Sequence, residues 1–141
     1  MRRVSIVIGV CFLLALGISM IGQGRDLDTI MKEIGPMWQG PMGLQTAMTS
    51  ATPDFAKVSA DAAKLQGLFA EAEAQFTKMK MTEAAGFAKT AGDAAGAVAK
   101  EAKTGKLADA KASAAGIAQC KACHGKYREA DGAGGFKLKA Q

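Results

Sequence analysis

The feature that most limits the fold of this 141-residue chain is a long run of helix-forming residues between Leu27 and Arg128. Alanine, lysine, glutamate, leucine and methionine are abundant in this run, β-branched residues are few, and the whole chain has only three prolines. Because such residues lose little conformational freedom in a helix, the run predicts helix almost throughout and requires no strand. The sequence therefore predicts an all-α protein.

Two helices are predicted in the first half of this run. The first begins at Asp26 or Asp28, either of which can cap it, and then meets Gly35-Pro36 and Gly40-Pro41. Because proline removes an amide donor and crowds the preceding turn, we expect this helix to be kinked at Gly-Pro. The second follows Thr52-Pro53-Asp54, and its apolar residues recur at helical spacing: Phe55, Val58, Ala62, Leu65, Leu68, Phe69 and Phe76.

Two further helices are predicted in the second half. One begins near Thr82 and Glu83, with Thr82 as a possible cap, and ends at Thr104-Gly105. The other carries its apolar stripe from Leu107 to Tyr127. Because the connections are short, successive helices should run in opposite directions, which predicts an antiparallel up-down-up-down four-helix bundle over residues 25–131. The glycine-rich tail, residues 132–141, is predicted to be disordered.

Residues 1–24 have the features of a secretory signal peptide. Two arginines precede an apolar run, and small residues follow it. A membrane anchor is the alternative, but the glycines near the end of the run favour cleavage, here placed after Gly24. The sequence thus predicts a periplasmic protein exported from a bacterium, with no stable membrane association after cleavage. Removal of the segment lowers the net charge from +5 to +3, and this weak basicity predicts no nucleic-acid partner.

A C-x-x-C-H motif lies on the last predicted helix. Cys120, Cys123 and His124 are the only cysteines and histidine after residue 24. At helical spacing, both sulfurs and the imidazole project from nearly one face, so the thiols can reach two vinyl groups while the imidazole reaches iron. The motif therefore predicts one covalently attached haem c, with His124 as the proximal axial iron ligand. The alanine-dominated helices bury little apolar area themselves, and a large flat cofactor would help to fill such a core.

Three other roles of the two cysteines are weaker. A zinc site requires about four ligands, and the exported chain offers no further cysteine or histidine. A thioredoxin-like pair usually follows a strand at a helix N-terminus, and none is predicted here. A structural disulfide over so short a loop would remove little chain entropy. Covalent haem attachment is therefore the preferred interpretation.

The string CKACHGKYRE resembles the class II cytochromes c, the family of cytochrome c′ and the low-spin cytochromes c556. In this family the haem motif lies near the C-terminus and is followed by an aromatic and a basic residue, here Tyr127 and Arg128. The string IMKEIGPMW is similar to the first helix of the cytochrome c556-like members. The resemblance covers most of residues 26–130, and it implies Met31 as the distal axial iron ligand.

The sixth iron ligand decides between two functions. Met31 lies on the apolar side of the first helix, and Met37 and Met42 are its possible substitutes. Methionine ligation favours ferrous iron and predicts an electron-transfer protein with redox partner proteins, as a monomer or homodimer. Five-coordinate iron would instead predict a cytochrome c′-like protein that binds nitric oxide or carbon monoxide.

The remaining predictions concern the surroundings of the haem. Trp38, Phe87 and Tyr127 are candidates for haem contact, and Arg128 is a candidate partner for a propionate. The sequence shows no second histidine and no acid–base pair near the motif, so no enzyme activity is predicted.

Overall fold

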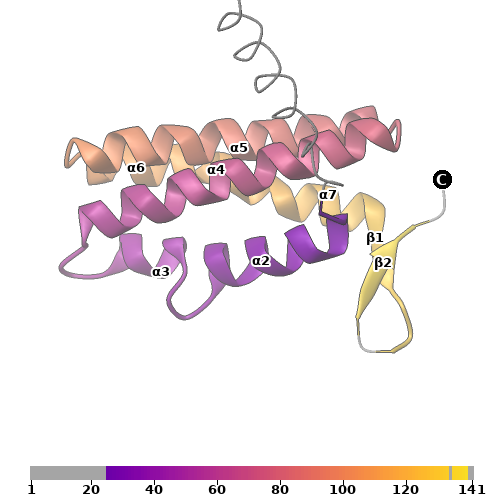
Figure 1. The fold of residues 1–141 in the computed structure, drawn as a ribbon. Coiled ribbons are helices and arrows are strands. Elements are labelled where there is room, and N and C mark those ends of the chain that lie inside the picture. The colour runs from indigo at the N-terminus through magenta and orange to yellow at the C-terminus, as the bar shows by residue number, and fades with distance from the viewer. Residues whose placement is uncertain (1–24, 134, 140–141) are drawn as a thin grey trace, which may run out of the picture.

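The computed structural model describes residues 25–133 and 135–139 and is mostly helical (Figure 1). The elements, in chain order, are α2 (Leu27–Gln39), α3 (Leu44–Thr49), α4 (Phe55–Lys78), α5 (Thr82–Lys103), α6 (Leu107–Ala114), the 3-10 helix η1 (Ala115–Ala118), α7 (Gln119–Tyr127), β1 (Arg128–Ala130) and β2 (Phe136–Leu138). The predicted all-α class is confirmed. The predicted signal peptide lies outside the described residues, and no helix within them is long and apolar enough to cross a membrane.

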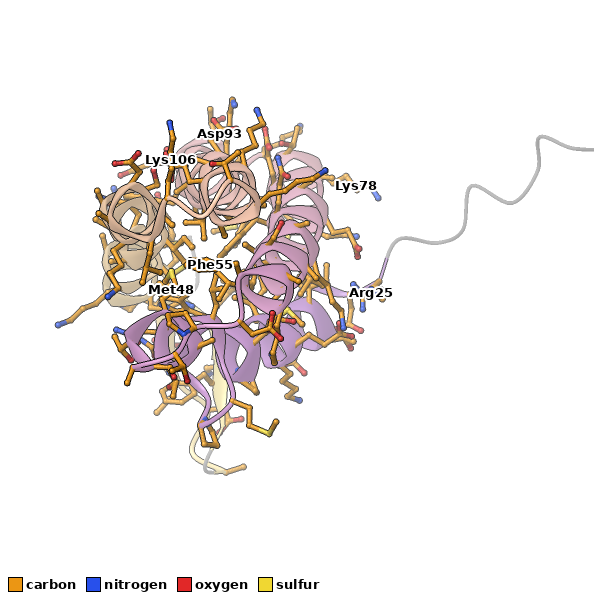
Figure 2. All side chains as sticks on the ribbon, turned by 90° about the vertical axis from the view of Figure 1, so that its left-hand side faces the viewer. Arg25, Met48, Phe55, Lys78, Asp93 and Lys106 are labelled. Carbon is orange, nitrogen blue, oxygen red and sulfur yellow. The ribbon has the colours of Figure 1, made fainter. Side chains whose placement is uncertain are left out.

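The long helices lie side by side. Figure 1 shows α4 and α5 running in opposite directions, joined by residues 79–81. Helix α2 packs against α4, while α6, η1 and α7 pack against α5. In Figure 2, which looks along the helices, the charged side chains of Lys78, Asp93 and Lys106 point outward, whereas the buried Met48 lies toward the middle. Phe55, which belongs to the predicted apolar stripe of α4, is an exception, since it is 37% exposed. The amphipathic patterns of the sequence therefore face the core as expected.

Local signals place the starts of α2 and α4. The Asp26 carboxylate accepts hydrogen bonds from the backbone N and the Oγ1 of Thr29, at 2.9 and 2.7 Å. The Asp54 carboxylate accepts from the backbone N of Lys57 at 3.0 Å. Both aspartates satisfy amides that have no partner inside the helix. The prediction of a cap at Asp26 or Asp28 is confirmed at Asp26, and the predicted start of the second helix after Asp54 is confirmed as well.

The predicted cap at Thr82 is wrong. Met81 occupies the N-cap position of α5, Thr82 is the first helical residue, and no side chain caps this start. Glu83 contributes the acidic group expected in the first turn. The predicted end is confirmed, since Thr104 is the C-cap residue and Gly105 has a φ of +74°, a conformation that glycine adopts without steric cost.

The two Gly-Pro pairs occupy different positions. Pro36 lies inside α2, which continues to Gln39, whereas Gly40-Pro41 lies in the connection to α3. The backbone N of Gly40 donates to the Pro36 carbonyl at 2.8 Å, and a Cβ at Gly40 would come within 2.3 Å of that oxygen. The turn that ends α2 therefore requires glycine at position 40.

The single helix predicted from Leu107 to Tyr127 is interrupted. Residues 115–118 form the 3-10 helix η1, in which Ile117 is fully buried. At Gly116 the backbone approaches α5 so closely that an added Cβ would lie 2.7 Å from the Cβ of Ala94. The change from α-helix to the tighter 3-10 helix thus coincides with close packing against α5. The alanines of this segment by themselves favour an α-helix.

The tail also differs from the prediction. Strands β1 and β2 pair antiparallel, with Arg128 opposite Leu138 and Ala130 opposite Phe136. The turn is closed by the Asp131 carboxylate, which accepts from the backbone N of Ala133 at 2.8 Å and from that of Gly135 at 2.9 Å. Disorder from residue 132 onward was therefore predicted wrongly for residues 136–138, because a side chain that organises its own turn offsets the high glycine content.

Candidate functional site

A cavity of about 580 Å³ lies between α2, α4, α5 and α7. Its volume falls within the roughly 300–1,000 Å³ range of small-molecule and cofactor sites. Four predicted site residues line it: Met31, Cys120, Cys123 and His124. Most of the other lining side chains are apolar or aromatic, including Ile34, Trp38, Phe69, Phe76 and Phe87. The structure thus places Met31, from the first described helix, in one cavity with the motif of the last helix.

Helix α7 directs the motif toward this cavity. Both cysteines carry free thiols, and Cys123 is buried with 7% of its surface exposed. Cys120 and His124 are half-buried. Because residues three and four apart share a helix face, all three side chains line the same space, as the spacing of the motif predicts.

The electrostatic surroundings favour neutral thiols. Burial, and secondarily the neighbouring Cys123, raises the pKa of Cys120 to about 11. Burial and then the charge of Glu83 also raise the pKa of Cys123. Thiols of redox pairs instead have lowered pKa values, because the thiolate is the reactive form. The site is therefore unlike a thioredoxin-type centre.

His124 is placed as a neutral imidazole. Burial, and then the positive charge of Arg128, lowers the pKa of His124. The Arg128 Nη1 lies 3.4 Å from the His124 Nδ1, and the guanidinium stacks 3.4 Å from the centroid of the Phe136 ring. Neutral imidazole is the form that binds metal ions. Arg128 also lines the cavity.

Helix α7 is tied to the start of α5 by Glu83. The Glu83 carboxylate accepts a hydrogen bond from the Tyr127 hydroxyl at 2.8 Å and an ion-paired one from Lys126. These bonds, that of Lys126 first, lower the pKa of Glu83. Tyr127 itself is buried, and it lies next to a second cavity described below. The contact fixes the end of α7 and hence the direction of the motif.

Helix α2 is tied to α4 by Arg25. Its Nε donates to Oε2 of Glu71 at 2.9 Å and its Nη2 to Oε1 at 3.0 Å, while its backbone carbonyl accepts from Gln75 at 2.8 Å. Exposed ion pairs contribute little free energy, but a two-pronged arginine contact fixes geometry. Together with buried Ile30 and Ile34, it holds the half-buried Met31 at the cavity wall.

A second cavity of about 330 Å³ adjoins the first. Five residues line both: Met31, Phe76, Cys123, His124 and Arg128. The second cavity is also lined by residues 135–138 of the terminal hairpin. Nothing in the sequence indicates that the hairpin belongs to the site. The cavity-lining roles of Phe69 and Phe76 were also missed, because a helical stripe does not reveal which core residues line a cavity.

The candidate ligand methionines have different environments. Met31 is the only methionine among the lining residues of these two cavities. Met37 is half-buried, and Met42 is 79% exposed. The structure therefore places Met31, and neither of its possible substitutes, in a cavity with His124.

The described part of the chain has no group of three or more histidine, cysteine, aspartate or glutamate side chains arranged to hold a metal ion. Comparison with protein-family models, curated proteins and solved structures gives no match to this chain.

Proposed function

We propose that the chain is an exported monohaem c-type cytochrome that transfers electrons, with His124 and Met31 as the axial ligands of the iron. The observation that carries this proposal is the shared cavity lined by both cysteines, His124 and Met31. The side-by-side helices support the finer fold proposal, an antiparallel four-helix bundle of the class II cytochrome c type, kinked at the Gly-Pro of the first helix.

The residues present fit a haem. Two free thiols would hold it through thioether bonds, and a neutral imidazole would ligate its iron. Aromatic and aliphatic side chains, among them Trp38 and Phe87, would exclude water from the macrocycle. Arg128, at the edge of the cavity, is positioned to pair with a propionate. When bound, haem supplies an iron that changes between the ferrous and ferric states.

The ligand pair is what favours electron transfer over gas binding. A thioether ligand raises the reduction potential and leaves no open position for an exogenous ligand. The apolar lining disfavours the additional charge of ferric iron, which shifts the potential in the same direction. Met31 is held on a helix that is anchored at Arg25, so its position is set by the fold rather than by a loop.

The absorption spectrum of the haem-loaded, full-length protein tests the proposal. We expect low-spin ferric iron with the far-red band of sulfur-to-iron charge transfer, and weak carbon monoxide binding after reduction. Met31→Ala should abolish the band, whereas Met37→Ala, a substitution of a half-buried methionine outside both cavities, should retain it. A high-spin wild-type protein that binds carbon monoxide readily would instead support the gas-binding alternative.

Covalent attachment is tested separately by mass. Replacement of both Cys120 and Cys123 by alanine should remove the haem mass from the denatured polypeptide. The wild type should retain it after denaturation and should begin at Arg25 in the periplasmic fraction. Haem that dissociates from the denatured wild type would refute the proposed attachment.

A further inference from the structure

The C-terminal hairpin is joined to the candidate site by several independent contacts. The backbone N of Lys139 donates to the Tyr127 carbonyl at 2.9 Å, and its Nζ donates to the Gly125 carbonyl at 3.0 Å. The Phe136 ring stacks on Arg128, which in turn lies beside His124. In Figure 1 the hairpin leaves the end of α7 next to the beginning of α2. The hairpin is therefore held beside the motif, where its residues 135–138 line the second cavity.

Two large apolar side chains of β2 remain exposed to solvent. Phe136 is 55% exposed and Leu138 is 37% exposed. Because they are two residues apart on a strand, they lie on the same side of the ribbon. Lys137 lies between them and forms an ion pair with Glu129, its partner in the register, at 3.5 Å. Apolar and charged side chains thus alternate along β2, as they do in strands that bury one face and expose the other.

These side chains line the 330 Å³ cavity together with His124, Cys123 and Met31. An isolated two-stranded hairpin is marginally stable in water, so this ribbon needs a partner surface. The neighbouring protein surface leaves much of Phe136 and Leu138 exposed, and the free space lies on the side of the haem motif. A flat apolar group extending into this cavity would cover both side chains.

We infer that the hairpin is a wall of the cofactor site and that Phe136 and Leu138 contact the haem attached to Cys120 and Cys123. This inference rests on the proposed function. It adds two cofactor-binding residues that lie outside the four-helix domain predicted from the sequence, and it assigns the hairpin the role of shielding the His124 side of the haem from solvent.

The test is proton NMR of the haem-loaded, full-length protein in its reduced, diamagnetic form, with carbon monoxide added if the ferrous iron is high-spin. The ring current of the macrocycle should displace the Leu138 methyl resonances upfield, and nuclear Overhauser effects should connect them to haem protons. Leu138→Ala assigns these resonances by their disappearance. The Ala133 methyl, in the exposed turn of the same hairpin, is the internal control and should have an ordinary shift.

Ordinary Leu138 shifts without Overhauser effects to the haem, in a protein with covalently attached haem, would overturn the inference and leave the proposed function intact. A protein that attaches no haem would overturn both. The decisive signals come from the wild type, and Leu138→Ala serves only to assign them.

Discussion

The contact between Gly116 and Ala94 offers the sharpest test of how the motif helix is positioned. An added Cβ at Gly116 would lie 2.7 Å from the Ala94 Cβ, whereas carbon atoms in favourable contact are about 3.5–4.0 Å apart. Gly116→Ala must therefore separate η1 from α5 by about 1 Å. Overpacking of this kind costs about 1–3 kcal/mol, and the gain in helix propensity offsets up to about 1 kcal/mol of it. We expect a net loss of about 1–2 kcal/mol in the free energy of unfolding.

A double variant that combines Gly116→Ala with Ala94→Gly separates the steric contact from the effects of the two substitutions on helix propensity. Ala94→Gly alone should cost about 1 kcal/mol, because glycine is disfavoured inside a helix. With both substitutions the methyl group moves from α5 to η1, the overlap disappears, and the total loss should be no more than about 1 kcal/mol. The two changes should therefore be coupled by about 1–2 kcal/mol in the direction of rescue.

Urea unfolding of the haem-loaded protein, followed by far-ultraviolet circular dichroism, measures these differences. The haem spectrum of Gly116→Ala should change as well, because α7 continues directly from η1. Strictly additive losses in the double variant, or a Gly116→Ala protein as stable as the wild type, would refute the close approach as the feature that sets the position of α7.

Three further outcomes are expected. Asp54→Ala should cost about 0.5–2 kcal/mol, measured by urea unfolding, through loss of the α4 cap, and Asp54→Asn should restore most of it. Ile117→Ala should cost about 2–5 kcal/mol in the same assay, because this side chain is fully buried, and exposed Ala115→Ser serves as the control. Hydrogen bonds lower the pKa of Glu83 in the folded protein. The contribution of this carboxylate to the free energy of unfolding is therefore complete above the ordinary glutamate pKa and is lost as the pH falls through the lower folded-state pKa. Glu83→Gln should therefore be less stable than the wild type at neutral pH and equally stable in strong acid, and a pH-independent difference would contradict this account.

The sequence predicted most accurately those features that depend on residues close together in the chain, such as helix starts and the spacing of the motif. Asp26 caps its helix through a residue three positions away, and the three residues of the C-x-x-C-H motif lie within about one turn of α7. The interruption at residues 115–118 could not be predicted in this way, because Ala94 belongs to another helix. Likewise, the shared cavity of Met31 and His124 depends on how α2 packs against α4 and α7 against α5, and only the family resemblance pointed to it.

The hairpin is a different case, since its signal was present in the sequence. Asp131-Gly132 is a strong turn dipeptide, and Phe136 and Leu138 alternate with lysines as in a half-buried strand. The abundance of glycine outweighed these signals in the prediction. The structure shows the Asp131 carboxylate closing the turn, with Gly132 at a φ of +81°.

Helix α6 has a consequence for the order in which the protein opens. Only two alanines of this helix, Ala110 and Ala114, are buried, whereas α4 buries three large aliphatic and two phenylalanine side chains. Because the free energy of local opening increases with the apolar contact that is lost, the amides of α6 should exchange with solvent before those of α4. Opening of α6 alone would leave α4 and α5 paired and α7 tied to α5 through Glu83. Helix α6 is thus expected to open before α4, and it lies directly before the segment that carries the motif.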